Sequence, residues 1–330
     1  MPKENIVSPV KISVVISCVK KGVGKMKVLV IGGTGWVGHN IVLELAKRGH
    51  NPEIFTRRSE GHYHSAVACF PHITGNKLDE EKLTRIVIKG QYDAIIDSVP
   101  HPEPIRILSR LKDHYGRYLH CGSTGVYTPL QYLPADEKHP FATRVYEGFG
   151  GKVDSDRSAI EQMAKGNLKG TILRPCCITG PGKLPLDNLG GRRNDFIPDI
   201  LQGETLDLPG EGNALLQIVH ISDLGRAFAL AVEKEESCGE IINICGAEAV
   251  TLKRYCEINA EALNKKAVIN LMDFEDMIAK YGEEIRSGLT FLVEHMCFHI
   301  RKAEKLLGYT PKYSIEDAVS ESARLTAQEL

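Results

Sequence analysis

The chain has 330 residues, of which 42% are hydrophobic and 25% are charged, as in an ordinary water-soluble globular protein. This composition excludes a disordered chain, a collagen-like repeat and a bundle of membrane helices. The 41 Lys and Arg residues nearly balance the 42 Asp and Glu residues, and the net charge is -1. No overall positive charge therefore draws the chain to nucleic acid or to anionic lipid, and we expect neither a nucleic acid nor a membrane as its partner.

The nine cysteines show no Cys-x-x-Cys pair and no regular spacing, which favours a reducing, cytoplasmic location over a disulfide framework. Near the start, residues 12–19 form the longest apolar run. This run is far shorter than the ~20 residues of a membrane span, and no small-residue cleavage site follows it. We expect residues 1–25 to be an extension outside the fold, with Met26 as a candidate native start.

Residues 26–31 (MKVLVI) form a short continuous apolar run, the pattern of a strand buried on both faces of a parallel sheet. A glycine-rich turn follows, and then Val37, Ile41, Val42 and Leu45 recur at helical spacing. Further strands are predicted at residues 53–56, 73–75, 94–98, 118–121, 171–173 and 241–245, with helical patterns between them at residues 79–88 and 105–111. This alternation predicts an α/β fold with a Rossmann-type, doubly wound parallel sheet.

Two stretches depart from the alternation. Residues 180–212 are rich in Gly, Pro and Asn, and the region after Val250 is mostly helical, with Thr251 and Ser314 as helix N-caps. We predict a dinucleotide-binding domain of residues 26–179 plus 213–249 and a smaller, mostly helical substrate lobe of residues 180–212 plus 250–330. The lobe should cover the carboxyl edge of the sheet, where an open α/β sheet binds its ligand.

The segment GGTGWVG places Gly32, Gly35 and Gly38 between the first strand and the first helix. These glycines allow a tight turn, close approach of a pyrophosphate to the backbone, and close contact between helix and strand. The helix N-terminus then offers free N–H groups to the phosphates. We therefore predict dinucleotide binding here. The predicted cofactor-binding residues of the turn and of two later strand ends are Gly32, Thr34, Gly35, Trp36, Val37, Gly38, Ser98 and Pro175.

The end of the second strand indicates which dinucleotide is bound. An NAD-selective site usually has an Asp or Glu there, about 20 residues past the glycines. This chain has Thr56, Arg57 and Arg58 instead. Two guanidinium groups can bind a 2′-phosphate through charge-assisted bonds, so the sequence favours NADP over NAD. The alternative is that Arg57 and Arg58 belong to a solvated loop.

Seven segments follow one another along the chain: GGTGWVG, YDAIIDS (92–98), STGVY (123–127), LRPCCITGPG (173–182), IVHISDLGRA (218–227), INICGAEAVT (242–251) and KLLGYTP (305–311). Together they resemble the extended short-chain dehydrogenase/reductase family of nucleotide-sugar epimerases and dehydratases, and most closely its atypical branch with the chloroplast stem-loop-binding proteins. The resemblance implies an NAD(P)-dependent oxidoreductase or epimerase/dehydratase-like enzyme, often a homodimer. Its substrate would be a small molecule with a hydroxyl or carbonyl group, such as a nucleotide sugar.

In such relatives a Ser or Thr, a Tyr and a Lys assist hydride transfer at a carbon that bears oxygen, with the Tyr as the acid or base. The resemblance places Ser123 at the Ser/Thr position. Aligning the later helix on Glu161 places Val153 at the Tyr position and Arg157 at the Lys position. Valine cannot exchange a proton, whereas Arg157 can still bond ribose hydroxyls. The chain contains no Tyr-x-x-x-Lys pair.

Tyr127, on the loop after the fifth strand, is the first candidate to replace the missing acid; the alternative is that it packs against the lobe. Tyr146 and Asp154 are weaker candidates. Ser123 either polarises a carbonyl group or is a plain strand-end hydroxyl. The predicted catalytic residues are therefore Ser123, Tyr127 and Arg157. Because the usual Tyr is missing, a non-catalytic NAD(P)-binding regulator or RNA-associated protein is the alternative function.

Other reactive side chains receive weaker interpretations. The His and Cys residues within 62–72 and 295–299 show no pattern that would hold ligands at about 2.0–2.3 Å from a metal, so no metal site is predicted. Cys176 and Cys177 are predicted to pack beside the nicotinamide rather than to act as nucleophiles. Lys183, Arg192 and Arg193 either bind a phosphate or carboxylate of the substrate or form a solvated basic loop.

Overall fold

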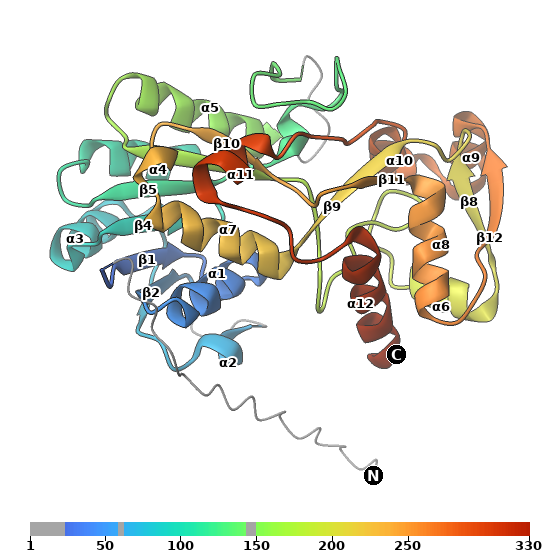
Figure 1. The fold of residues 1–330 in the computed structure, drawn as a ribbon, viewed down its shortest axis with the longest axis horizontal. Helices are drawn as coiled ribbons and strands as arrows, with labels where there is room; N and C mark the ends of the chain where they lie inside the picture. The colour runs from blue at the N-terminus through green and yellow to red at the C-terminus, as the bar shows by residue number, and fades with distance from the viewer. Residues whose placement is uncertain (1–23, 59–62, 143–149) are drawn as a thin grey trace, which may run out of the picture.

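The computed structural model describes residues 24–58, 63–142 and 150–330. A large sheet with helices on both faces forms one body, and a smaller lobe of helices and short strands lies beside it (Figure 1). The sheet has seven strands in the order β3-β2-β1-β4-β5-β6-β10, and every neighbouring pair is parallel. This arrangement confirms the predicted Rossmann-type fold.

Each of the seven predicted strands is found in this sheet. Their observed bounds are β1 Lys27–Ile31, β2 Asn51–Thr56, β3 His72–Thr74, β4 Ala94–Asp97, β5 Arg117–Cys121, β6 Gly170–Pro175 and β10 Ile241–Ile244. In β1, Val28 and Val30 face one hydrophobic cluster and Leu29 and Ile31 face a second one. The strand is therefore buried on both sides, which explains why its sequence is continuously apolar rather than alternating.

Helices cover both faces of the sheet. One face carries α1 (Trp36–Lys47) and α7 (Ile221–Glu233), and the other carries α3 (Glu80–Gly90), α4 (Pro102–Arg110) and α5 (Gly150–Ala164). A short helix, α2 (His64–Val67), follows β2. The helices α1 and α7 pack closely because Gly225 has no side chain; a Cβ there would lie 2.8 Å from the backbone oxygen of Asn40.

The lobe contains short strands that the sequence did not indicate, besides helices. Two of its strands, β8 (Thr205–Pro209) and β12 (Val268–Met272), come from the residues predicted for the lobe. A separate three-stranded sheet contains β11 (Ala249–Thr251) together with β7 (Cys177–Thr179) and β9 (Leu215–His220), whose residues were predicted to belong to the dinucleotide-binding domain. The lobe helices are α6 (Phe196–Gln202), α8 (Leu252–Ala262), α9 (Phe274–Tyr281) and α10 (Arg286–Leu292). The predicted N-cap of α8 is confirmed, because the hydroxyl of Thr251 accepts from the backbone N–H of Arg254 at 3.1 Å.

The last two helices go to different bodies. Helix α11 (Arg301–Leu307) packs on α7 and β10, so this part of the predicted lobe lies against the large sheet, whereas α12 (Ile315–Gln328) packs on α6 and α8 (Figure 1). Ser314 caps α12 as expected and accepts from the backbone N–H of Asp317 at 3.0 Å. Within the described ranges, no helix combines the length and the hydropathy that a membrane crossing requires.

Candidate functional site

The glycine-rich turn after β1 leaves no room for side chains. Gly32 has a φ of 81°, and a Cβ there would lie 2.6 Å from the hydroxyl of Ser98. A Cβ at Gly38 would overlap the carbonyl oxygen and carbon of Gly32. The backbone N–H of Gly35 donates to the carbonyl of Gly32 at 2.9 Å and closes the turn. The turn therefore presents bare backbone, as a pyrophosphate site requires.

Helix α1 begins at this turn with an N-terminus suited to an anion. Its N-cap is Gly35, which supplies no side-chain cap, and its first turn carries no acidic residue. The first N–H groups of a helix have no partner within the helix, and the helix dipole adds partial positive charge there. Trp36 and Val37, in this first turn, line the cavity described next. These residues fit the phosphates of a dinucleotide.

A cavity of about 740 Å³ lies at the carboxyl ends of the central strands and under the lobe. The sheet body contributes Trp36 and Val37 of α1, Ser98 after β4, the 121–125 segment after β5, Lys152 of α5 and Pro175 of β6. The lobe contributes residues including Lys183, Asp187, Arg192, Phe291 and Met296. The cavity therefore occupies the place that a doubly wound sheet provides for its ligand.

The lobe reaches over the glycine-rich turn at Trp36. The indole N–H of Trp36 donates to the carbonyl of Pro181 at 2.9 Å, and the ammonium group of Lys183 lies 5.3 Å from the centre of the indole ring. Burial, with a contribution from Arg192, lowers the pKa of Lys183. The only tryptophan of the chain thus lines the cavity at the contact between the two bodies.

Thr56, Arg57 and Arg58 lie at and after the end of β2. The hydroxyl of Thr56 is 2.9 Å from the hydroxyl of Thr34 in the glycine-rich turn, which ties the two segments together. Arg57 and Arg58 are exposed. Both guanidinium groups therefore remain accessible near the position where a ribose 2′-substituent is usually bound.

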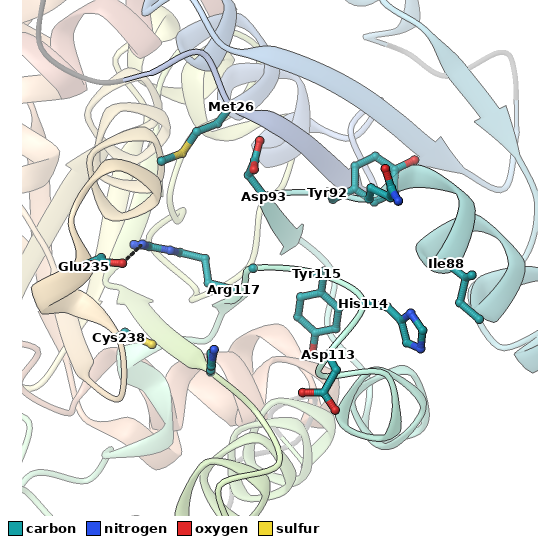
Figure 2. Close-up of a pocket in the computed structure, with 13 residues that line it drawn as sticks. Met26, Ile88, Tyr92, Asp93, Asp113, His114, Tyr115, Arg117, Glu235 and Cys238 are labelled. Atoms are coloured by element: carbon teal, nitrogen blue, oxygen red, sulfur yellow. Dashed lines mark ion pairs between the residues drawn. The ribbon is translucent and has the colours of Figure 1, made fainter.

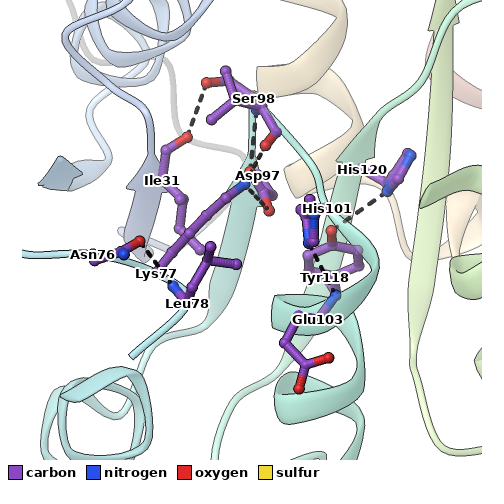
Figure 3. Close-up of polar contacts among 11 residues, drawn as sticks. Ile31, Asn76, Lys77, Leu78, Asp97, Ser98, His101, Glu103, Tyr118 and His120 are labelled. Carbon is purple, nitrogen blue, oxygen red and sulfur yellow. Dashed lines mark hydrogen bonds and ion pairs between the residues drawn. The ribbon is translucent and has the colours of Figure 1, made fainter. Parts of the chain in front are cut away.

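The end of β4 is fixed to its neighbours by buried polar groups (Figure 3). The hydroxyl of Ser98 donates to the carbonyl of Ile31 at 2.8 Å. The ammonium group of Lys77, which follows β3, lies 3.1 Å from both carboxylate oxygens of the fully buried Asp97 and also contacts the carbonyl of Val99. These contacts hold the carboxyl ends of the neighbouring strands β1 and β4, next to the glycine-rich turn, in a defined position.

Ser123 and Tyr127, two of the predicted catalytic residues, lie in different surroundings. Ser123 lines the cavity, and its hydroxyl accepts from the backbone N–H of Gly125 at 3.1 Å. Tyr127 is fully buried, and its hydroxyl donates to the side-chain oxygen of Asn243 at 3.2 Å. Burial raises the pKa of Tyr127 to about 12. In the described structure Tyr127 packs in the interior, and its ring centre lies 6.1 Å from that of Phe298, a residue of the predicted lobe.

We expect a Tyr127→Phe variant to keep dinucleotide affinity and turnover within about threefold of the wild type. The change removes one buried hydrogen bond, and such a loss costs about 1 kcal/mol of unfolding free energy. Urea unfolding and steady-state kinetics on the same preparation measure both quantities. A loss of turnover beyond about 100-fold with unchanged stability would instead make Tyr127 the acid.

Helix α5 places Lys152, and not Arg157, at the cavity. Arg157 is exposed, and its guanidinium group stacks on Phe141 at 5.3 Å from the ring centre. Lys152 is partly buried and lines the cavity, and Val153 is buried. The helix position that faces the cavity is therefore five residues earlier than the alignment on Glu161 predicts.

This shift has a physical cause and a signal in the sequence. Asp156, four residues after Lys152, is the carboxylate of α5 that is buried against the sheet, whereas Glu161 pairs with Lys165 at the surface. The Lys-x-x-x-Asp spacing of Lys152 and Asp156, together with Arg174 in the LRP segment as a partner for a buried carboxylate, could have indicated that Lys152 faces the cavity. With Lys152 at the Lys position, the Tyr position falls on Gly148, which lies outside the described residues, as does Tyr146. Asp154 is exposed and does not line the cavity.

The remaining reactive residues have mostly structural surroundings. Cys176 is buried and Cys177 half-buried, and burial raises the pKa of both thiols. No group of three or more potential metal ligands converges within the described parts of the chain. His62 lies outside the described residues.

Three cations of the lobe, Lys183, Arg192 and Arg193, line the cavity. Arg193, however, forms ion pairs with Asp187 at 3.6 Å and Asp199 at 3.5 Å.

The lobe wall is shaped by a buried carboxylate and two glycines. Asp187 accepts from the backbone N–H groups of Leu189 at 2.7 Å and Arg193 at 2.6 Å. Gly190 has a φ of 80°, and a Cβ there would overlap the backbone of Gly288, at the start of α10. Two segments almost a hundred residues apart are therefore in backbone contact on one side of the cavity.

A second cavity, of about 840 Å³, lies at the opposite edge of the sheet, at the amino ends of the strands (Figure 2). Its charges are mixed: Arg117 lies 3.7 Å from the carboxylate of Glu235, and Asp93 is nearby. Arg117 also donates to the carbonyl of Lys234, at the end of α7, at 2.9 Å. Because ligands of open parallel sheets bind at the carboxyl ends of the strands, the first cavity is the candidate site.

The sequence matches the model of the NAD dependent epimerase/dehydratase family over residues 28–245. It is 24% identical over 315 residues to the chloroplast stem-loop binding protein of 41 kDa b of Arabidopsis thaliana. That match covers 91% of this chain and 79% of the Arabidopsis protein. It is also 25% identical over 293 residues to UDP-glucose 4-epimerase of Homo sapiens, covering 73% of this chain and 83% of that protein.

A similar solved structure is dTDP-glucose 4,6-dehydratase of Bacillus anthracis in complex with NAD. The TM-score is 0.71 at 18% identity, over 92% of this chain and 97% of that chain, which supports the two-body Rossmann-type fold. The family model covers well over half of the chain, and the resemblance seen in the sequence motifs is confirmed. The chain belongs to the NAD-dependent epimerase/dehydratase family.

Proposed function

We propose that the chain is an NAD(P)-dependent epimerase or dehydratase-like enzyme that acts on a nucleotide sugar. The observation that carries this proposal is a single cavity in which an uncapped helix N-terminus, the hydroxyl of Ser123 and the ammonium group of Lys152 face a basic lobe. We further propose that the enzyme works in the cytoplasm as a homodimer. The first part is in keeping with the cysteines of the described residues, which are all free, and the second with the family resemblance, which implies a homodimer.

The chain's own residues have separate tasks in this proposal. The bare backbone of the glycine-rich turn and the start of α1 bind the phosphates of the dinucleotide, which when bound supplies a nicotinamide that accepts and returns a hydride. The hydroxyl of Ser123 bonds the substrate oxygen at the reacting carbon. The ammonium group of Lys152 supplies positive charge and a proton donor beside it.

The substrate's anionic group is assigned to the lobe. Lys183 and Arg192 line the cavity, and no ion pair of either residue is found among the described residues. Arg193 is less suitable because Asp187 and Asp199 already neutralise it. A diphosphate would pair with both cations. The UDP- and dTDP-linked sugars for which the relatives are named carry a diphosphate.

The test is conversion of nucleotide sugars by the purified chain with NAD or NADP, followed by chromatography of the products. We expect conversion of at least one UDP- or dTDP-linked sugar and none of the matching free sugars, because these lack the diphosphate. Cofactor binding without conversion of any nucleotide sugar, or equal conversion of free sugars, would overturn the proposed substrate class.

Selectivity for NADP is the finer part of the proposal and rests on the exposed Arg57 and Arg58. We expect NADPH to bind about tenfold more tightly than NADH, and the Arg57→Ala, Arg58→Ala double variant to lose this preference while its NADH affinity is unchanged. Quenching of the single tryptophan, Trp36, reports binding directly. The control is Arg85→Ala, an exposed arginine on α3. Equal affinities in the wild type would point to NAD.

A second function is favoured by one comparison. The Arabidopsis relative that matches 91% of this chain is named for binding a stem-loop, and the position of the family's tyrosine falls on Gly148. A dinucleotide-binding, RNA-associated protein is therefore the alternative proposal. The net charge of -1 argues against it, because phosphate neutralisation supplies most of such affinity. Salt-dependent RNA binding, without sugar conversion, would favour the alternative.

A further inference from the structure

A buried carboxylate joins helix α5 to two strands of the large sheet. The Asp156 carboxylate is 2.7 Å from Nε2 of His120, on β5, and it accepts from Nε of Arg174, on β6, at 2.7 Å. All three residues are at least 98% buried. Nδ1 of His120 lies 3.4 Å from the hydroxyl of Tyr118, which extends the network on β5 (Figure 3).

The network lies directly beneath the cavity. Gly122, the first residue after β5, lines the cavity and packs on Asp156; a Cβ there would be 2.8 Å from a carboxylate oxygen of Asp156. Ser123 follows Gly122, and Pro175 follows Arg174, and both also line the cavity. One carboxylate thus contacts the strand ends that carry two segments of the site.

The same carboxylate sets the position of Lys152. Residues four apart lie on one face of a helix, so Lys152 is one turn above Asp156 on the side of α5 that faces the sheet and the cavity. Asp154, between them, is exposed. Fixing Asp156 therefore fixes the rotation and the height of the first turns of α5 relative to the strands.

From this geometry we infer that Asp156 is a positioning residue: its carboxylate, held by His120 and Arg174, orients Lys152 and Ser123 toward the same point of the cavity. The expected effect on turnover rests on the proposed function. The placement of Lys152 and Ser123 by Asp156 does not depend on any substrate. The hydrogen bonds from His120 and Arg174 outweigh burial and lower the pKa of Asp156. Its negative charge is therefore kept in the interior.

The first test is Asp156→Asn, which keeps the shape of the side chain and removes its charge. We expect kcat to fall about 10- to 100-fold, while the dissociation constant for NADPH, read from Trp36, changes less than about threefold. The matched control is Asp154→Asn on the same helix, which should match the wild type in both quantities. A variant with normal kcat per folded molecule and only lower stability would show that Asp156 is merely structural.

The second test needs no substrate. Acetylation of Lys152 by an N-hydroxysuccinimide ester, measured by mass spectrometry, should be slowed at least about tenfold by saturating NADPH in the wild type. In Asp156→Asn this protection should be lost, although NADPH still binds. Acetylation of Lys165, which is exposed and directly follows the same helix, should be unaffected throughout. Retained protection in the variant would overturn the inference even if the chain converts no nucleotide sugar.

His120→Leu provides a second variant if Asp156→Asn does not fold. It leaves the ion pair between Asp156 and Arg174 and removes one of the two partners of the carboxylate. We expect a smaller loss of kcat and of Lys152 protection than in Asp156→Asn. Unchanged kcat and unchanged protection in His120→Leu would also contradict the inference, because one of the two attachments of α5 would then have no effect on the site.

Discussion

Replacing Gly38 by alanine is expected to weaken dinucleotide binding at least about 100-fold, or by ~2.7 kcal/mol. The added Cβ would overlap the backbone of Gly32, and backbone atoms in a tight turn cannot move aside as a flexible side chain can. The turn or the start of α1 must shift, so the free N–H groups no longer converge on the phosphates. Titration of Trp36 fluorescence with NADPH measures the loss.

The control for this variant is Gly225→Ala, another change at a close helix contact. Its Cβ would lie 2.8 Å from the backbone oxygen of Asn40, where α7 packs on the first turns of α1, and would not meet the backbone of Gly32. We expect Gly225→Ala to lower the free energy of unfolding and to keep NADPH affinity per folded molecule within about threefold. If Gly38→Ala bound NADPH normally, the pyrophosphate would have to be held elsewhere, and the assignment of this turn would be wrong.

Replacing Lys152 by methionine is expected to lower kcat about 100- to 1,000-fold, the range typical for loss of a positioned proton donor or of one stabilising charge. Methionine keeps the length of the side chain and removes its charge. Because Lys152 lines the cavity near the residues that follow β5, its charge is available where the substrate oxygen is proposed to lie. Steady-state kinetics with the converted nucleotide sugar give kcat and KM separately.

Two variants, one on the same helix and one directly after it, make this result specific. Arg157→Met tests the position that the alignment on Glu161 predicts, and Lys165→Met removes a surface charge paired with Glu161. We expect both to retain kcat within about threefold. A large loss in Arg157→Met with a normal Lys152→Met would restore the earlier alignment and would require α5 to rotate when the cofactor binds.

The large sheet could be predicted from the sequence because its strands are buried on both faces. The apolar runs at β1, β4 and β6 stand out from the surrounding chain, and each is bounded by Gly, Pro or polar residues. The lobe strands could not be predicted in this way. The residues of strands such as β11 and β12 are largely half-buried or exposed, so no continuous apolar run marks these strands and their pairing depends on contacts with distant segments.

The candidate site was only partly predictable for a similar reason. The glycine-rich turn carries its function in consecutive residues, and Ser123 follows a strand end. The position of Lys152 depends on which carboxylate of α5 is buried, and that is decided by His120 and Arg174, which are 36 and 18 residues away from Asp156. A pattern within the helix alone cannot choose between Asp156 and Glu161.

The backbone contact between Gly190 and Gly288 has a consequence for redesign. Because the backbone of Gly190 touches the backbone of Gly288, the distance between residues 187–192 and the start of α10 is set there without side chains. Neighbouring positions such as Arg192 and Phe291, which line the cavity, can then be exchanged to admit a bulkier or a less charged ligand without changing the fold of the lobe. An enzyme engineer who wished to retune this protein would begin at those neighbours and would leave both glycines untouched.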